Sequence, residues 1–383
     1  MRSVDSFNIE RKRVILRVDF NVPIDSKGIV EDDTRIKAAK PTLDYLLEHN
    51  CKVILISYLG RPEKNDPSFS LKPTLKNLAE LYPEYEIVFV DDFLKDDSQI
   101  INQTGNQIIL LENIRFHPEE KNCEVSYVKK IASYGDIFVN DAFSVSHRKE
   151  ATVTELPQYM PSYAGFLLER EVKMLKKALG GKGKPRVTIL GGAKVSTKIN
   201  LIDAFINSSD YILLGGALAN TFLAARGDQM GESLFEKDYL DKARELVKNA
   251  EDKGCKMLLP IDFVCDDETM AVLDIGPDTV KQYAEIISRA HTIIWNGPMG
   301  YYEDPRYRAG SDLLFSAIAA NHTALSIIGG GDTLLILENK SEEEKSHISH
   351  ISTGGGAMLE FIENGTLPGI EAILDAQQHE SAQ

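Results

Sequence analysis

Ten short apolar segments, separated by stretches in which apolar residues recur at helical spacing, constrain the fold of this chain more than any other feature. Strands that alternate with helices along a chain are typical of parallel α/β architecture. In the first half, the predicted strands are residues 14–18, 53–57, 87–90, 108–111 and 137–140. In the second half, they are residues 187–190, 212–214, 257–260, 292–295 and 324–328. Two runs of five strands predict two sheets, and therefore two domains.

A helix and a segment rich in helix-breaking residues separate the two runs. Pro161-Ser162 is expected to open the helix, and apolar residues recur at helical spacing from Leu168 to Leu179. Gly180-Gly181-Lys182-Gly183-Lys184-Pro185 should stop it. This segment is the predicted domain boundary.

Glycine and polar residues follow the predicted strands in both halves. In the first half they are Asp19-Phe20-Asn21, Gly60-Arg61, Asn113-Ile114-Arg115 and residues 141–148. In the second half they are residues 191–194, Gly215-Gly216, Asn296-Gly297-Pro298 and residues 329–333. Open parallel sheets bind ligands beyond the carboxyl ends of their strands. Arginine forks suit carboxylates and phosphates, and glycine turns suit nucleotide phosphates, so we expect an anionic substrate on one domain and a nucleotide on the other.

The stretch Gly329-Gly330-Gly331-Asp332-Thr333 lies where a predicted strand ends and a helix should begin. Three glycines let a backbone approach a ligand closely, and the N–H groups at a helix start suit an anion. Asp332 adds a carboxylate of the kind that holds Mg²⁺ together with bound phosphates. The simplest alternative is a turn whose glycines serve only tight packing.

Lys194 and Lys198 are one helical turn apart, so we expect both ammonium groups on one helix face close to bound phosphates. The alternative is a solvated helix face. No GxxxxGK[ST] motif occurs, and no GxGxxG follows a predicted strand, which disfavours a P-loop protein and a dinucleotide-dependent dehydrogenase. Gly354-Gly355-Gly356 again precedes a predicted helix, and its N–H groups would stabilise charge on a phosphoryl group in transfer.

Composition narrows the possible partners and the compartment. The net charge of −15 over 383 residues argues against a nucleic-acid surface and against binding to an anionic membrane. Four scattered cysteines form no CxxC pair, which is typical of reduced residues and disfavours a zinc site. No apolar run approaches the ~20 residues of a membrane span, and Met1-Arg2-Ser3-Val4-Asp5 lacks a signal-peptide core. We therefore expect a cytoplasmic protein.

Long motifs in a fixed order make the chain similar to one family, from about Val14 to Leu374. They are Arg17-Val18-Asp19-Phe20-Asn21-Val22-Pro23, Leu59-Gly60-Arg61-Pro62, Glu112-Asn113-Ile114-Arg115-Phe116, Val139-Asn140-Asp141-Ala142-Phe143, Leu190-Gly191-Gly192-Ala193-Lys194-Val195, Trp295-Asn296-Gly297-Pro298-Met299-Gly300, residues 329–333, and Ile351-Ser352-Thr353-Gly354-Gly355-Gly356-Ala357. In these segments the chain resembles phosphoglycerate kinase.

The resemblance implies phosphoryl transfer from 1,3-bisphosphoglycerate to ADP with Mg²⁺, which yields 3-phosphoglycerate and ATP. The implied acid-phosphate residues are Asp19, Phe20, Asn21, Arg35, Tyr58, Leu59, Gly60, Arg61, Arg115 and Arg148. The implied nucleotide residues are Gly192, Ala193, Lys194, Lys198, Gly216, Asn296, Pro298, Glu303, Gly330, Gly331, Asp332 and Thr333. Glu303 would reach the ribose, and Asp332 would serve the metal. The implied catalytic residues, which stabilise the migrating group, are Arg35, Lys194, Gly354, Gly355 and Gly356.

The resemblance also implies the domain plan. It consists of two doubly wound, Rossmann-like parallel-sheet domains that close by bending at a hinge. Residues 1–165 with the tail 366–383 would form the acid-phosphate domain, and residues 186–365 the nucleotide domain. Residues 166–185 would form the connecting helix and hinge. Members of the family are generally monomers that act on small molecules.

The chain departs from the family pattern on the acid-phosphate side. Ser-His-Leu-Gly-Arg-Pro is usual where this chain has Tyr58 in place of the histidine. Ser144-Val145-Ser146 replaces Gly-Thr-Ala, and Glu150 replaces a second histidine, which places an anion near the expected anion site. We expect Tyr58 to tune substrate affinity without abolishing it.

Two other functions stay open at this point. The first is a nucleotide-binding homologue with weakened or lost turnover, for which the altered substrate loops would be the signature. The second is a two-domain dehydrogenase, which would need the dinucleotide fingerprint that the sequence lacks. An NAD titration would test the dehydrogenase.

Overall fold

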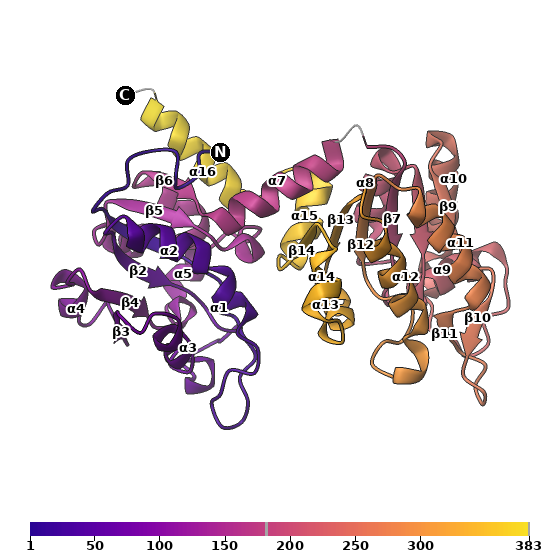
Figure 1. Ribbon diagram of the computed structural model, residues 1–383, viewed down its shortest axis with the longest axis horizontal. Coiled ribbons are helices and arrows are strands. Elements are labelled where there is room, and N and C mark those ends of the chain that lie inside the picture. Colours follow the sequence, from indigo (N-terminus) through magenta and orange to yellow (C-terminus); the bar gives the residue numbers. More distant parts are fainter. Residues whose placement is uncertain (181–182, 382–383) are drawn as a thin grey trace. The chain divides into compact units, whose positions relative to one another are not determined.

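The computed structural model describes residues 1–180 and 183–381 and divides into two compact units (Figure 1). Unit 1 holds Met1–Val172 and the chain from Thr366 onward, and unit 2 holds Lys173–Gly365. Each unit contains one six-stranded sheet in which every paired strand is parallel. The expected α/β class with two parallel sheets is therefore confirmed.

In unit 1 the strand order is β3-β4-β2-β1-β5-β6. The strands are β1 (Arg13–Arg17), β2 (Lys52–Ile56), β3 (Glu86–Val90), β4 (Gln107–Leu111), β5 (Ile137–Asn140) and β6 (Ser162–Ala164). The helices are α1 (Thr34–Ala38), α2 (Lys40–Glu48), α3 (Thr74–Leu81), α4 (Ser98–Ile101), α5 (Pro118–Asn122), α6 (Val125–Ala132) and α16 (Pro368–Ser381). Helix α7 (Phe166–Gly180) begins in unit 1 and ends in unit 2.

The central strands of unit 1 are continuous apolar runs because both faces of the sheet are covered. Leu16 packs in one core with Leu55, and the neighbouring Ile15 packs in another core with Ile54. Successive side chains of a strand point to opposite faces, so alternate residues enter different cores. This double burial explains why continuous apolar runs in the sequence located these strands.

In unit 2 the strand order is β14-β13-β12-β7-β8-β9. The strands are β7 (Arg186–Leu190), β8 (Tyr211–Leu214), β9 (Lys256–Leu258), β12 (Thr292–Asn296), β13 (Leu325–Gly329) and β14 (His350–Ser352). An antiparallel pair is formed by β10 (Phe263–Cys265) and β11 (Val272–Ile275). The helices are α8 (Ile199–Ser208), α9 (Gly216–Arg226), α10 (Leu240–Lys253), α11 (Pro277–Ser288), α12 (Ala309–Ala320), α13 (Gly331–Glu338), α14 (Glu342–Ser346) and α15 (Gly356–Asn364).

In each sheet the chain adds strands first on one side of its first strand and then on the other side. In unit 1 the chain moves outward from β1 through β2 and later returns to place β5 on the other side of β1. In unit 2 it leaves β7 through β8 and returns to place β12 beside β7. Such switch points open a crevice beyond the carboxyl ends of the strands. Predicted site residues at or after the ends of β1, β5, β7 and β12 lie at these points.

The sequence prediction was wrong at the start of the connecting helix. Pro161-Ser162 does not open it, because Ser162–Ala164 forms strand β6 and pairs with β5, and α7 begins at Phe166. Pairing satisfies backbone groups at the edge of β5 that would otherwise need other partners. The helix ends at Gly180, while Gly181 and Lys182 of the predicted stop segment lie outside the described residues.

All ten predicted strands are present, and four others were missed. The missed strands are β6, β10, β11 and β14, which span three or four residues each. The strand predicted at residues 257–260 is found at Lys256–Leu258. Short strands carry little periodicity of their own and depend on their neighbours for pairing.

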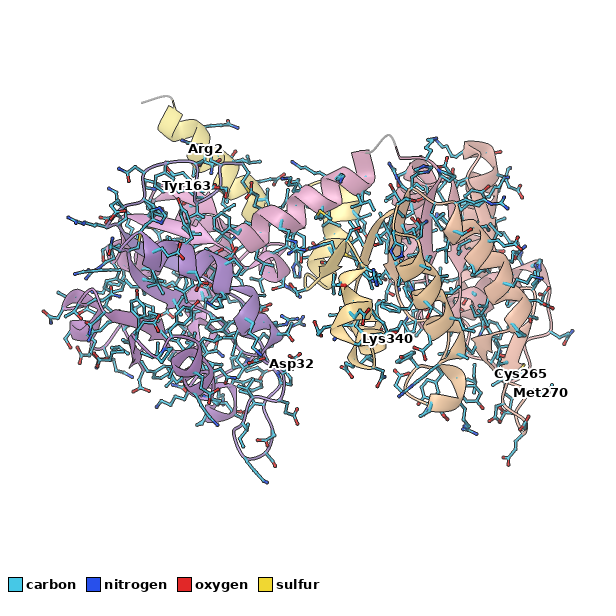
Figure 2. All side chains as sticks on the ribbon, in the orientation of Figure 1. Arg2, Asp32, Tyr163, Cys265, Met270 and Lys340 are labelled. Carbon is cyan, nitrogen blue, oxygen red and sulfur yellow. The ribbon has the colours of Figure 1, made fainter. Side chains whose placement is uncertain are left out.

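The two ends of unit 1 pack together. The backbone N–H of Arg2 donates to Gln377 Oε1 of α16 at 2.7 Å, and the Gln377 amide donates to the Ser162 carbonyl of β6 at 3.0 Å. The Arg2 guanidinium lies 5.7 Å from the ring centre of Tyr163 (Figure 2). Helix α16 is thus held against the edge strand of this sheet.

Candidate functional site

In unit 1 the loops after β1 and β2 are joined by short hydrogen bonds. Asp19 Oδ1 accepts the N–H of Asn21 at 2.9 Å, and Asn21 Oδ1 accepts the N–H of Gly60 at 2.8 Å. The side chains of Phe20 and Leu59 are buried in the core of this unit, so only their backbone faces the loops. The hydrogen bond from Gly60 to Asn21 therefore links the two loops.

Arg35 lies on α1 and forms an ion pair with Asp19. The Ser144 hydroxyl donates to the same carboxylate oxygen of Asp19. Asp19 is 7% exposed, whereas the Arg35 side chain is 30% exposed. The Arg35 guanidinium thus keeps access to solvent while one of its N–H groups is anchored.

Arg115 follows β4 and is fixed on three sides. Its Nη1 donates to the Gly60 carbonyl at 2.8 Å, and its Nη2 lies 2.6 Å from Glu150 Oε1. Its guanidinium carbon lies 4.0 Å from the centre of the Tyr58 ring, and the same ring is 5.2 Å from the guanidinium of Arg17. Cation–π contacts of this kind stabilise a desolvated arginine.

Burial, and then the nearby charge of Asp19, raise the pKa of Tyr58 to about 12, against the opposing effects of the surrounding arginines. Tyr58 is therefore a neutral phenol at physiological pH. It keeps a hydroxyl for hydrogen bonding, but it carries no positive charge.

The three departures from the family pattern are connected to one another through this network. Tyr58 contacts Arg115, which pairs with Glu150. Ser144 donates to Asp19, whose charge acts on Tyr58. The replacements therefore form one continuous set of contacts around the predicted acid-phosphate residues.

Two predicted site residues stay outside this network. The side chains of Arg61 and Arg148 are exposed, and neither makes a hydrogen bond or an ion pair with any residue in the described ranges 1–180 and 183–381. Both follow strands of the same sheet, so their charges remain available at the same edge of unit 1.

Sequence reasoning assigned no role to a buried charge cluster beneath this surface. Arg17 is fully buried, and its Nε donates to Thr152 Oγ1 at 3.1 Å, which in turn donates to Glu120 Oε1 at 2.6 Å. Burial raises the pKa of Glu120 to about 7, although Arg17 opposes this shift. An arginine at the end of an apolar strand was the available signal, because such a charge needs a partner inside the fold.

In unit 2 three glycine-containing loops meet at the switch point. The N–H of Gly192 donates to the Pro298 carbonyl at 3.0 Å, and that of Gly216 donates to the Met299 carbonyl at 2.7 Å. Gly216 has φ +61°, and a Cβ there would lie 2.9 Å from backbone atoms of Gly192. Close packing of the loops thus accounts for Gly192 and Gly216, whose N–H groups are bonded within the protein.

The prediction that Lys194 and Lys198 share a helix face was wrong. Helix α8 begins only at Ile199, so both lysines lie in the preceding turn. Lys194 is exposed, whereas the ammonium of Lys198 donates to the Gly191 carbonyl and to Asn296 Oδ1, each at 2.7 Å. The turn directs Lys198 inward because two strand ends supply oxygen acceptors for it.

The predicted glycine–aspartate stretch forms the start of α13. Gly330 has φ +110°, and a Cβ on it would lie 2.1 Å from Asn296 Nδ2. Thr333 is buried, where its hydroxyl accepts the N–H of Gly297 at 2.6 Å and donates to the Gly329 carbonyl at 3.0 Å. Thr333 therefore holds two loops together, and Asp332 is the exposed side chain in the first turn.

Gly354, Gly355 and Gly356 lie at the start of α15 as expected. Gly355 has φ +52° and ψ −118°, a conformation that favours glycine. The N–H of Gly354 donates to Ser352 Oγ at 3.1 Å. The first N–H groups of the helix have no acceptor within it, so this turn can donate to an anion.

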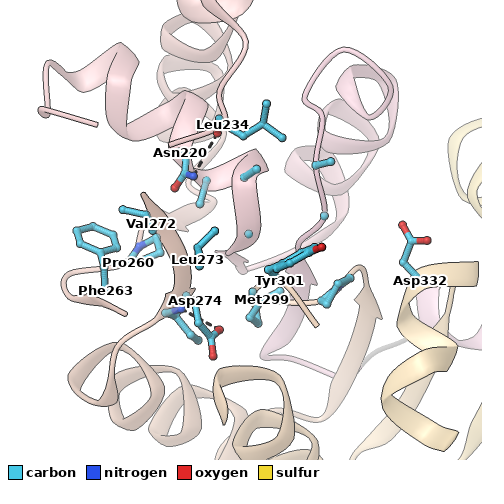
Figure 3. A pocket seen from close by; sticks show the side chains of 18 of the residues that line it. Asn220, Leu234, Pro260, Phe263, Val272, Leu273, Asp274, Met299, Tyr301 and Asp332 are labelled. Atoms are coloured by element: carbon cyan, nitrogen blue, oxygen red, sulfur yellow. Dashed lines mark hydrogen bonds between the residues drawn. The ribbon is translucent and has the colours of Figure 1, made fainter. Parts of the chain in front are cut away.

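A pocket of about 280 Å³ in unit 2 lies beside the glycine loops (Figure 3). Its walls are apolar and include Phe263, Val272 and Tyr301, and Glu303 and Asp332 supply carboxylates. Of the predicted nucleotide residues, it is lined by Gly192, Ala193, Gly216, Pro298, Glu303 and Asp332. An apolar slot beside helix starts and glycine turns suits a nucleotide, with the base in the slot.

The β10–β11 pair that builds one wall of this pocket was not predicted. Phe263 and Val272 come from these two strands, and Leu273 follows Val272. The available signal was a pair of short apolar runs around the acidic turn Asp266-Asp267-Glu268.

Asp332 fits a magnesium ion held mainly through phosphates. Asp332 is exposed in the first turn of α13. Burial lowers the pKa of Lys198 to about 8, and the charge of Asp332 opposes this shift. Within residues 1–180 and 183–381, no group of three or more His, Cys, Asp or Glu side chains forms a metal cage. Mg²⁺ commonly uses one or two carboxylates and completes its shell with water and substrate oxygens.

None of the helices in the described part of the chain combines the length and apolar character needed to cross a membrane.

Comparison with known proteins gives the same family on every measure. The family model described as phosphoglycerate kinase matches residues 4–365. The phosphoglycerate kinase of Chloroflexus aurantiacus is 41% identical over 389 residues, which cover 96% of this chain and 97% of that protein. The phosphoglycerate kinase of Koribacter versatilis is 42% identical over 399 residues and covers 97% and 98%, respectively.

Solved structures agree with these sequence matches. The phosphoglycerate kinase from Coxiella burnetii superposes with a TM-score of 0.88 at 36% identity, covering 97% of this chain and 98% of that chain. The phosphoglycerate kinase from Pyrococcus horikoshii OT3 gives a TM-score of 0.86 at 30% identity, covering 99% and 100%, respectively.

Proposed function

This chain belongs to the phosphoglycerate kinase family, and from that premise we propose that unit 1 binds the acid phosphate and unit 2 binds the nucleotide. The family reaction is reversible phosphoryl transfer from 1,3-bisphosphoglycerate to ADP, which gives 3-phosphoglycerate and ATP. The chain is a phosphotransferase of this kind, with a carboxyl group as acceptor in the reverse direction.

The observation that carries the nucleotide assignment is the meeting of Lys198, Asn296 and Asp332 beside the glycine loops of unit 2. Asn296 Oδ1 accepts a hydrogen bond from Lys198, and the Asp332 charge acts on the same ammonium. An ammonium, a carboxylate and a helix start at one point supply what polyphosphate and Mg²⁺ require. The adjacent apolar pocket is then the base site, and Glu303 on its wall contacts the ribose.

On unit 1, the arginines are proposed to hold the carboxylate and phosphate ends of the three-carbon acid. Arg35 and Arg115 lie in the Asp19–Tyr58 network, and Arg61 and Arg148 add exposed charge at the same edge. A planar guanidinium donates two parallel hydrogen bonds to an oxyanion. Asp19 and Asn21 complete the surface, with Asn21 fixing the Gly60 loop.

Phosphoryl transfer needs positioning and charge neutralisation more than proton transfer. We assign stabilisation of the migrating group to Arg35 and Lys194, assisted by the N–H groups of residues 354–356. Mg²⁺, when bound, would neutralise charge on the nucleotide phosphates, with Asp332 as its protein carboxylate. Replacing Asp332 by Asn should raise the Mg²⁺ concentration that gives half-maximal rate, and an unchanged requirement would remove Asp332 from this role.

The domain plan remains a proposal, with residues 1–165 and 366–383 as the acid-phosphate domain, 166–185 as connecting helix and hinge, and 186–365 as the nucleotide domain. In-line transfer requires reacting oxygens ~3 Å apart. Because the two substrates are assigned to different units, turnover would involve bending at the connection that contains α7.

We further propose that the enzyme acts as a monomer in the cytoplasm on these small molecules. The four free cysteines suit a reducing compartment, and the net charge of −15 disfavours nucleic-acid binding. Sedimentation or light scattering of the purified protein would test the monomer.

The test of the proposed function is formation of ATP from ADP and 1,3-bisphosphoglycerate, measured with purified protein and Mg²⁺. We expect ATP to accumulate in proportion to enzyme and to depend on both substrates. Normal ADP binding without ATP formation would instead support a nucleotide-binding homologue that has lost turnover.

A further inference from the structure

Arg115 carries a positive charge that the chain already neutralises. Its Nη2 lies 2.6 Å from Glu150 Oε1, and the two side chains are only 14% and 13% exposed. Charge-assisted contacts at this distance and burial are among the stronger hydrogen bonds in proteins. An oxyanion that takes this N–H of Arg115 Nη2 must therefore displace the Glu150 carboxylate from it.

Glu150 itself is incompletely bonded. Its Oε2 lies 3.9 Å from Nη2 of Arg17, which is too long for a hydrogen bond. Both of these atoms are buried, and neither forms a hydrogen bond with another residue in the described part of the chain. A buried carboxylate oxygen without a hydrogen bond is costly, and the charge of Arg17 at 3.9 Å is the attraction that acts against this cost.

Arg115 does not depend on Glu150 for its orientation. The Gly60 carbonyl accepts from Nη1 at 2.8 Å, and the Tyr58 ring supports the guanidinium at 4.0 Å. These two contacts come from the loop after β2 and do not involve Glu150. Glu150 therefore adds negative charge at Arg115 more than it adds order.

We propose that Glu150 is an internal competitor for the acid phosphate, which holds Arg115 until a substrate oxyanion displaces its carboxylate. This inference rests on the assignment of the acid phosphate to unit 1. Glu150 acts on the substrate through the charge of Arg115, so its effect is on substrate affinity. Its release frees one arginine fork for the bound anion, and the local charge becomes more positive as the carboxylate turns away.

The test replaces Glu150 by Gln, which keeps the shape and a hydrogen-bond acceptor but removes the charge. We expect Kd for 3-phosphoglycerate, measured by titration calorimetry without nucleotide, to fall about tenfold, equivalent to about 1.4 kcal/mol. KM for 3-phosphoglycerate should fall with it, while KM for ATP stays within about twofold of the wild-type value. Glu124→Gln is the matched control, because Glu124 is exposed in the same unit. It removes the same charge away from the arginines.

An unchanged Kd in Glu150→Gln would overturn the proposal, since it would mean that the carboxylate does not compete for Arg115. A higher Kd would also overturn it, since it would mean that the carboxylate orients Arg115 for binding. Equal effects of Glu150→Gln and Glu124→Gln would also overturn it, because the effect would then be one of net charge only. Glu150→Ala tests the same point if the Gln variant fails to fold. Wild-type protein that binds 3-phosphoglycerate but forms no ATP would contradict the proposed function. The role of Glu150 would still be decided by the calorimetric comparison of the variants, because that comparison needs binding but no turnover.

Discussion

The ammonium of Lys198 donates to Asn296 Oδ1 at 2.7 Å and so joins the turn after β7 to the end of β12. The same ammonium donates to the Gly191 carbonyl at 2.7 Å. Asn296 in turn donates from Nδ2 to the Gly329 carbonyl at 2.8 Å. One lysine and one asparagine thus tie three strand ends of unit 2 together at the proposed phosphate site.

The affinity for ADP should fall with rising pH because of Lys198. Burial lowers the pKa of Lys198 to about 8, although the charge of Asp332 opposes this shift. The ammonium that attracts phosphate is therefore present at pH 7 and lost as pH rises through 8. We expect KM for ADP to rise about tenfold between pH 7 and pH 9, since one pKa unit corresponds to a tenfold change. Lys198→Arg, which keeps its charge over this range, should show a flat profile, and a flat wild-type profile would contradict the role of Lys198.

Tyr58→His should change substrate affinity moderately and leave turnover largely intact. The histidine removes the ring that lies 4.0 Å from Arg115 but offers a group that can become cationic. A cation–π contact is worth up to about 2 kcal/mol, so we expect KM for 3-phosphoglycerate to change by no more than about thirtyfold. Steady-state kinetics of both proteins, with Tyr58→Phe as control for the hydroxyl, would measure this. An inactive wild type together with an active histidine variant would show that Tyr58 does not merely tune affinity.

Arg35→Ala should reduce turnover far more than nucleotide affinity. Arg35 belongs to unit 1 and pairs with Asp19, whereas the proposed nucleotide residues belong to unit 2. Loss of a group that stabilises transition-state charge typically lowers kcat by about 10²–10³-fold. Kd for ADP should stay within about twofold of the wild-type value, because substitutions at distant sites that share no partners have independent effects. Lys37→Ala on the same helix is the control, and an equal loss of ADP binding in Arg35→Ala would reject the assignment.

Asp141→Asn should remove a decrease in the free energy of unfolding that Asp141 causes as pH rises from 4 to 6. Burial raises the pKa of Asp141 to about 6, although hydrogen bonds from Thr42 and from the N–H groups of Leu167 and Leu168 favour the ionised form. The folded pKa lies above the unfolded value of ~3.9, so the contribution of Asp141 to stability is fully present below pH 4 and is lost as pH rises to 6.

Above pH 6 the Asn variant should therefore be more stable than the wild type, by up to about 3 kcal/mol. Its amide oxygen can still accept the two N–H groups at the start of α7. Urea unfolding at pH 4, 5, 6 and 7 would measure the difference, with Asp136→Asn at an exposed position as the control. A wild-type slope between pH 4 and 6 that persists in Asp141→Asn would assign the effect to another group.

Continuous apolar runs in the sequence predicted the sheets because their strands are buried on both faces. Val53 and Ile54, for example, are each at most 1% exposed although they point to opposite sides. The prediction failed where neighbours decide the conformation. Ser162–Ala164 is a strand because β5 offers it an edge, and the turn before α8 is not helical although Lys194 and Lys198 have helical spacing.

The candidate site divides in the same way. Motifs identified Arg115, Asp332 and the glycine turns by residue type and order. They did not reveal that Arg115 pairs with Glu150, or that Thr333 is a buried clamp. The hairpin residues Phe263 and Val272, which form the pocket wall, also escaped notice because neither belongs to a charged or glycine-rich motif.

The sequence by itself determined the α/β class, the two sheets and the type of residue at each strand end, because hydrophobic period and turn chemistry act over a few neighbouring residues. Only the tertiary structure decided which charges are free and which are already paired. Arg115 and Glu150 are 35 positions apart. Their contact depends on where the fold places the end of β4 and the segment after β5. The electrostatic energy of the pair depends on the distance between the two charges in space, and separation along the chain does not enter it.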